Sequence, residues 1–269
     1  MALEFYKRRF RKPGKKMQYF LAFTALLLAI LAVTTWMYVR HRLSLIGSED
    51  GEDDLSSTVS AEQYTAEDKA GLLVVFTGDE QMRFVLITTD PANAAVTVTA
   101  IPDDTATGND TTLSALYQKH GGARAVSAVA TLSKQPVKHY LSISADNAEK
   151  WFNRLENGLT VTLSSPLSYP AADGSPTTLS AGEHTLNAVQ ITALLSYAET
   201  PEQACAELLA AMLQQYLRTG RNLTSDFSFL ANATQTNLRI GDFTAYRDAL
   251  SYLATKNDEG VCTVTASVI

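Results

Sequence analysis

The sequence holds few of the residues that usually carry metal or nucleophilic chemistry. Only two of its 269 residues are cysteines, Cys205 and Cys262, and only four are histidines. Two cysteines cannot form the disulfide framework of a small secreted scaffold, so they form either one disulfide or two buried thiols, and the thiols are the favoured interpretation. The histidines lack the spacing of a metal site. The sequence also has no Gly-x-Ser-x-Gly turn, which argues against that class of nucleophilic hydrolase.

Basic residues are scarce beyond the first 42 positions. Residues 43–269 keep 13 of the 22 Lys and Arg but 27 of the 28 Asp and Glu, so this part carries a formal charge of −14. Binding to nucleic acid needs a basic footprint, and the composition therefore excludes nucleic acid as a partner. Anionic polymers would also be repelled unless a local basic pocket overrides the long-range field.

The N-terminus, in contrast, combines positive charge with a long apolar run. Seven Lys and Arg lie within Lys7–Lys16, and the 23 residues of Met17–Val39 carry no formal charge. A helix of this length measures about 34 Å, enough to cross a hydrocarbon core of about 30 Å. A cleaved signal peptide would have a shorter apolar region followed by small residues, whereas this run ends in Trp36–Arg40. The charge asymmetry predicts a cytoplasmic N-terminus and an extracytoplasmic C-terminal part.

Four parts follow from these patterns. We predict a basic cytoplasmic tail (1–16), a transmembrane helix (17–39), an acidic flexible tether (40–69) and one folded extracytoplasmic domain (70–269). The tether is inferred from Gly47–Lys69, which holds eight acidic residues among Ser, Thr and Gly. Such a segment buries too little apolar surface to offset the entropy cost of ordering it. The expected location is the cell membrane, with a single-pass anchor.

The folded part alternates predicted strands and helices. Leu72–Phe76 is a continuous apolar run, as expected for a strand buried on both faces, and Phe84–Thr89 forms a hairpin with Val96–Ile101. Thr200-Pro201 predicts a helix start, with Thr200 as N-cap and Gln203 completing a capping box. The other predicted strands are His139–Ile143, Leu159–Leu163 and Val261–Ile269, and the other predicted helices are Thr112–Lys119, Ala123–Leu132, a segment from Ala148 to Leu155, and Phe243–Ala254. This alternation predicts an α/β fold whose mixed central sheet has helices on both faces.

Several short motifs in this domain follow one another in a characteristic order. They are Leu72–Asp79, Val85–Pro91, Ile101-Pro102-Asp103-Asp104-Thr105, Gly121-Gly122, His139-Tyr140, Trp151-Phe152, Leu186-Asn187 with Gln190, and Thr236-Asn237-Leu238. In this order and spacing the chain resembles the LytR-CpsA-Psr (LCP) family, membrane-anchored extracytoplasmic enzymes of bacterial cell walls. The resemblance extends from Leu72 to about Leu253.

The resemblance implies a reaction, the transfer of a glycopolymer from a polyprenyl pyrophosphate carrier to peptidoglycan. A family member is expected to hold a divalent metal on Asp side chains, to grip the pyrophosphate with arginines, and to place the lipid tail in an apolar cavity. Asp79 and Asp104 match acidic positions of the family. Asp79 would then be the metal ligand, with Mg²⁺ as the metal if the chain is an active enzyme.

The sequence departs from the family pattern where this chemistry is expected. Asp103 stands in place of the arginine of Ile-Pro-Arg-Asp-Thr, and Ser196 and Ala198 align with two further arginines. The arginine-rich helix is replaced by Glu202–Glu207, and a second acidic position falls near Met82. A charge about 5 Å from a phosphate is worth about 3 kcal/mol at an effective dielectric constant of about 20. Replacing Arg by Asp therefore changes that contact by about 6–7 kcal/mol.

The sequence thus predicts a degenerate, non-catalytic member of the family that needs no cofactor. Its expected partners are a polyprenyl-phosphate lipid or its glycopolymer, or another envelope protein, which could also supply the missing cations. The alternative is an active phosphotransferase with a rebuilt basic site, for which Arg83 and Arg124 are the candidate substitutes. A third possibility is that side chains fill the cavity and that only a protein–protein surface remains.

Overall fold

The computed structural model describes residues 64–269, except 79–80, 109–110, 156–157, 172–173 and 220–231. The predicted cytoplasmic tail, transmembrane helix and most of the predicted tether lie outside the described residues. In the part that is described, no helix combines the length and the apolar character needed to cross a membrane. The final residues assigned to the tether include a short 3₁₀ turn, η2 (Ala66–Asp68), which Thr65 and Asp68 close with a capping box.

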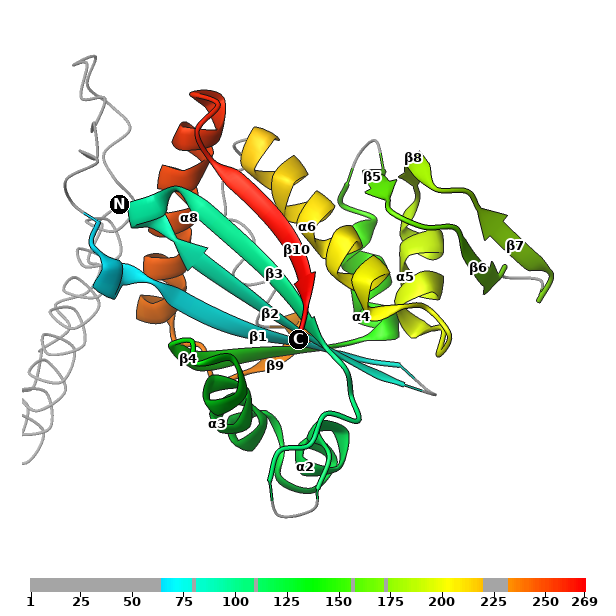
Figure 1. Cartoon of the computed structure of the whole chain (residues 1–269), viewed down its shortest axis with the longest axis horizontal. Coiled ribbons are helices and arrows are strands. Elements are labelled where there is room, and N and C mark those ends of the chain that lie inside the picture. Colours follow the sequence, from blue (N-terminus) through cyan, green and yellow to red (C-terminus); the bar gives the residue numbers. More distant parts are fainter. Residues whose placement is uncertain (1–63, 79–80, 109–110, 156–157, 172–173, 220–231) are drawn as a thin grey trace, which may run out of the picture. The chain divides into compact units, whose positions relative to one another are not determined.

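A six-stranded mixed sheet forms the centre of the domain (Figure 1). Its order is β10-β3-β2-β1-β4-β9, in which β1 runs parallel to β4 and β10 runs parallel to β3, while the other neighbours are antiparallel. The strands are β1 (Ala70–Thr77), β2 (Met82–Asp90), β3 (Ala95–Ile101), β4 (Val137–Ser144), β9 (Thr234–Thr236) and β10 (Thr263–Val268). The short turn η3 (Pro91–Asn93) joins β2 to β3. The predicted α/β fold with a mixed sheet and this hairpin are confirmed.

Helices cover both faces of the sheet (Figure 1). One face packs against α2 (Leu113–His120) and α3 (Gly122–Ser133), and the other against α4 (Ala145–Phe152), α5 (Ala188–Ser196), α6 (Glu202–Thr219) and α8 (Ile240–Asp258). The central strand β1 serves both layers, because Leu73 and Val75 join the α3 core while Val74 and Phe76 join the α6 core. This alternation explains why the sequence of β1 is apolar at every position from Leu72 to Phe76.

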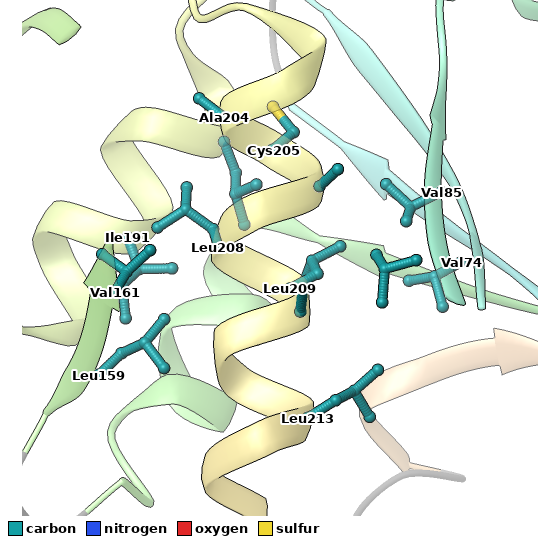
Figure 2. Packing of buried hydrophobic residues seen from close by; sticks show 14 of the residues in the cluster. Val74, Val85, Leu159, Val161, Ile191, Ala204, Cys205, Leu208, Leu209 and Leu213 are labelled. Atoms are coloured by element: carbon teal, nitrogen blue, oxygen red, sulfur yellow. The ribbon is translucent and has the colours of Figure 1, made fainter. Parts of the chain in front are cut away.

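Helix α6 is buried on two sides. Figure 2 shows Leu209 and Leu213 on the side of α6 that faces Val74 and Val85 of the sheet. On the other side, Leu208 lies toward Val161 and Ile191 (Figure 2). On that side the same core extends to α5 and to two small antiparallel sheets, β5 (Leu159–Leu163) with β8 (Gly182–Leu186) and β6 (Leu167–Pro170) with β7 (Pro176–Leu179).

The start of α6 differs from the prediction. The helix begins at Glu202, and the Thr200 hydroxyl has no hydrogen-bond partner within the described part of the chain. The predicted capping box is wrong, because the Gln203 side chain donates to Glu207 one turn further along. A capping box is present instead at the start of α5, between Asn187 and Gln190.

Both cysteines are free thiols, as the favoured interpretation expected. Cys205 is fully buried on α6, and Cys262 is partly buried just before β10. Burial raises the pKa of the Cys205 thiol to about 12, with only partial compensation by the charge of Arg83. A thiol in this state behaves as a small apolar side chain.

Candidate functional site

Arg83 on β2 is a fully buried charged side chain, with 1% of its surface exposed. Its Nη1 atom donates to the Glu202 carboxylate at 2.5 Å. Its Nη2 atom donates to the carbonyl oxygens of Tyr197 at 2.6 Å and Ala198 at 3.1 Å, and its Nε atom donates to that of Leu195 at 3.4 Å. All three guanidinium nitrogens are therefore bound to the protein itself.

These contacts show what Arg83 does. The carbonyl groups at the end of a helix lack partners within the helix, and a cation placed there is favoured by the helix dipole. Arg83 binds the carbonyl groups at the end of α5 and ties them to the first residue of α6 through Glu202. Ala198, one of the two positions where the resemblance led us to expect an arginine, offers only its backbone oxygen to this guanidinium. Arg83 therefore joins β2, α5 and α6.

The carboxyl group of Glu202 has a raised pKa despite its contact with Arg83. Burial raises the pKa of its carboxyl group, Arg83 counteracts this, and the negative charges of Asp103 and Asp104 raise the pKa further. The Oε2 atom of Glu202 is buried and has no hydrogen-bond partner among the described residues. This end of the sheet thus brings three carboxyl groups near one guanidinium.

Asp103 and Asp104 follow β3 in a turn that leads toward α2. The Asp103 carbonyl accepts a hydrogen bond from the Ser114 backbone, and Asp104 is exposed. Within the described ranges, no three His, Cys, Asp or Glu side chains converge as a metal site would require. Asp79, the predicted metal ligand, lies outside the described residues. The acidic side chains that are described do not by themselves fit a divalent metal.

Arg124 lies on the other side of the sheet from Arg83 and Glu202. It is exposed on α3, which packs on the face of the sheet opposite α6. Arg83 points to the α6 face, where it meets Glu202. The structure therefore separates the two candidate substitutes by the sheet and does not bring them together at one ligand.

An apolar cavity of about 180 Å³ lies between the sheet and helices α4, α6 and α8. Side chains from β1, β2 and β4 form its floor, and the helices form its walls. It is lined by Leu72, Val74, Phe76, Ile87, Thr89, Leu141, Ile143, Ala148, Trp151, Phe152, Leu155, Leu209, Met212, Leu213, Tyr216, Leu238, Phe243, Tyr246, Arg247 and Leu250. An apolar cavity of the kind that the resemblance implied is therefore present, and the side chains of the described residues do not fill it.

The α8 wall of the cavity is fixed by a chain of polar contacts. The Tyr246 hydroxyl donates to the Gly71 carbonyl at 2.9 Å, at the start of β1. His139 on β4 lies 3.4 Å from the same hydroxyl through Nδ1 and 3.5 Å from the Asp242 carboxylate through Nε2. Burial, and then the charge of Asp242, raise the pKa of Tyr246 to about 12, so the phenol stays protonated at neutral pH and can donate.

The sequence analysis missed the contribution of α8 to the cavity. Phe243, Tyr246, Arg247 and Leu250 recur at the three- and four-residue spacing of one helix face, and all four line the cavity. That periodicity was present in the predicted helix Phe243–Ala254. What the spacing could not show is that the face covers a cavity and not a packed core.

Comparison with known proteins was consistent with this architecture. The LytR_cpsA_psr family model matches residues 77–266. No protein with a curated description matches the sequence significantly.

Several solved structures share the fold. A protein from Eubacterium siraeum DSM 15702 superposes with a TM-score of 0.65 at 16% identity, covering 81% of this chain and 88% of that protein. TagV from B. subtilis gives a TM-score of 0.56 at 17% identity, with 75% and 84% covered. TagT in complex with LIIa-WTA gives 0.54 at 16% identity, with 76% and 79% covered. The family match covers residues 77–266, from the last residue of β1 into β10 and well over half of the chain, and the chain therefore belongs to the LytR-CpsA-Psr family.

Proposed function

We propose that this chain is a membrane-anchored, extracytoplasmic LCP protein of the bacterial cell envelope that binds a polyprenyl-linked lipid or glycopolymer without transferring the polymer. The observation that carries the proposal is the Arg83–Glu202 contact, because it already binds the buried arginine. We call the end of the sheet that holds Arg83, Glu202, Asp103 and Asp104 the site end. The cavity is proposed to hold hydrocarbon. No metal is needed for this function.

Electrostatics supports a binding role over a transferring one. A pyrophosphate leaving group requires cations that are already in place when its charge develops. In this chain the described charged groups near Glu202 include, besides Arg83, the carboxylates of Asp103 and Asp104, which would repel a pyrophosphate. Turning Arg83 toward a substrate would also leave Glu202 buried and unpaired, a change that typically costs about 3–5 kcal/mol.

The cavity supports lipid binding over a purely protein–protein function. Its lining is almost entirely apolar, and burying hydrocarbon in such a site is favoured by about 25 cal/mol per Å² of apolar surface. The empty space of about 180 Å³ exceeds an engineered cavity of about 150 Å³ that binds benzene. TagT, which shares the fold, is recorded in complex with LI-WTA and with LIIa-WTA.

A cavity-filling substitution tests the binding role. The full chain in detergent micelles should bind a fluorescent polyprenyl phosphate with saturation, and Leu72→Trp should weaken binding at least tenfold because the indole occupies the floor of the cavity. Leu132→Trp is the matched control, because Leu132 lies on α3 on the opposite face. Equal binding by the two variants would contradict the proposed binding site.

A further inference from the structure

The cavity has one charged group in its lining. Among the residues that form its wall in the described part of the chain, Arg247 is the one with a charged side chain. Its side chain is 28% exposed, so the guanidinium lies where the cavity meets solvent. An otherwise apolar cavity with a cation at its mouth has the polarity of a site for an amphiphile, with the charged head outside and the tail inside.

This mouth lies far from the Arg83–Glu202 contact. Arg83 is paired with Phe76, near the end of β1, whereas Tyr246 binds Gly71 at its beginning. Phe76 lies five positions after Gly71 along the strand, a distance of roughly 17 Å. Arg247 follows Tyr246 on α8 and lines the cavity together with Leu72, the neighbour of Gly71. The cavity therefore has an acidic site end beyond Phe76 and, near Leu72, a mouth at which Arg247 is paired with the exposed carboxylate of Asp248.

The partner of Arg247 leaves it available to a ligand. Its Nε and Nη2 atoms both donate to one oxygen of Asp248, the next residue in the chain, at 2.9 and 2.6 Å. The Asp248 side chain is 54% exposed. Ion pairs of this kind are worth about 0–1 kcal/mol, because water competes with both partners. A phosphate accepts two parallel N–H bonds from a guanidinium and would compete well with this carboxylate.

We propose that Arg247 binds the head group of an amphiphile with a single hydrocarbon chain and an anionic head, and that the tail extends from this mouth along β1 toward Phe76. The proposal rests on the proposed lipid-binding function of the cavity and adds the orientation and charge of the ligand. The orientation follows from the charges at the two ends. At the site end Arg83 is buried and fully bound, and the carboxylates of Asp103, Asp104 and Glu202 repel an anionic head. At the mouth Asp242 lies beside His139, and an anionic head can displace the exposed Asp248 carboxylate from Arg247.

Matched short lipids test the proposal. The probes are geranyl phosphate and geraniol, and decyl phosphate and decanol, so that each pair differs only in the charged head. Binding can be followed through the fluorescence of Trp151, which lines the cavity, in the full chain carrying Trp36→Phe. We expect each phosphate to bind about tenfold more tightly than its alcohol. The chain type that binds more tightly identifies an isoprenoid or a straight-chain source, and either result agrees with the proposal.

Variants of Arg247 test whether this residue causes the preference for the phosphate over the alcohol. Arg247→Gln should reduce the ratio between phosphate and alcohol affinities to below twofold, and Arg247→Lys should keep most of that ratio. Arg124→Gln, on the opposite face of the sheet, should behave as the parent chain does.

Three results would overturn the proposal. Equal binding of phosphate and alcohol by the parent chain would remove the head-group site but leave the lipid-binding cavity intact. A preference that survives Arg247→Gln would place the head elsewhere. Failure of all four probes to bind would contradict both the head-group site and the proposed function.

Discussion

At the scale of the residue, Arg83 shows why position in a motif does not determine role. It lies beside the expected site in the sequence, yet its partners are 112 to 119 positions away, on the chain between Leu195 and Glu202. No local pattern connects residues at such separations, so the sequence could nominate Arg83 but could not show that its charge is used within the core. The replacement of family arginines by Asp103, Ser196 and Ala198 stays a prediction of the sequence, which rests on the motif order alone.

Removal of Arg83 tests this structural role. Arg83→Met should lower the free energy of unfolding by about 3–5 kcal/mol, because Glu202 would remain buried without its counter-ion. Urea unfolding of the full chain in detergent, followed by Trp151 fluorescence, measures the change. Arg124→Met is the matched control and should change stability by no more than about 0.5 kcal/mol, since Arg124 is exposed. A loss no larger than that of the control would show that the buried pair does not stabilise the domain.

The titration of Glu202 should make the stability of the fold depend on pH. Because burial raises its pKa, the folded state binds a proton more readily than the unfolded state, whose carboxyl group titrates near 4.5. Stability contributed by this group is therefore greatest below pH 4.5 and decreases as pH rises through the higher pKa of the folded state. Glu202→Gln removes this dependence, so the stability of the parent chain relative to the variant should fall between pH 4.5 and neutrality. A relative stability that rises over this range would mean that Arg83 lowers the pKa more than burial raises it.

At the scale of the element, strands and helices with a continuous apolar pattern were predictable, and short polar ones were not. β1 to β4 and the helices α2, α3 and α6 were expected because apolar runs or stripes marked them. The strands β6, β7 and β8 were missed, since each has only four or five residues and none contains a continuous apolar run. Their pairing depends on turns and on packing beside α5, which the sequence pattern does not reveal.

The contact between α3 and β4 depends on one glycine. A Cβ atom on Gly122 would lie 2.3 to 2.6 Å from ring atoms of Tyr140 on β4, so either the ring or the helix must move. Gly122→Ala should therefore reduce the free energy of unfolding by about 1–3 kcal/mol, as other overpacking changes do.

The matched control for this change is Gly241→Ala in α8, where no atom lies within 4 Å of the added Cβ. It should be neutral or stabilise by up to about 1 kcal/mol, because alanine favours the helix. Thermal unfolding of both variants measures the difference. If Gly122→Ala were as harmless as Gly241→Ala, the close packing of α3 on Tyr140 would be wrong.

At the scale of the whole molecule, the domain combines an apolar cavity with a cluster of carboxylates at one end of the sheet. The mixed sheet, the helices on both faces and the apolar cavity agree with membership of the LytR-CpsA-Psr family. The described site end carries Asp103, Asp104 and Glu202 around an arginine that is already bound. We infer that a module with these properties retains binding to a lipid carrier and has lost the stabilisation of a departing pyrophosphate.

The most direct measurement is a transfer assay on the full chain with lipid-linked glycopolymer, Mg²⁺ and peptidoglycan, beside a family member with intact arginines as the positive control. We predict no glycopolymer attached to peptidoglycan above the level without protein, and no difference between the parent chain and Asp104→Ala. Attached polymer that forms with the parent chain and disappears with Asp104→Ala would contradict the non-catalytic function.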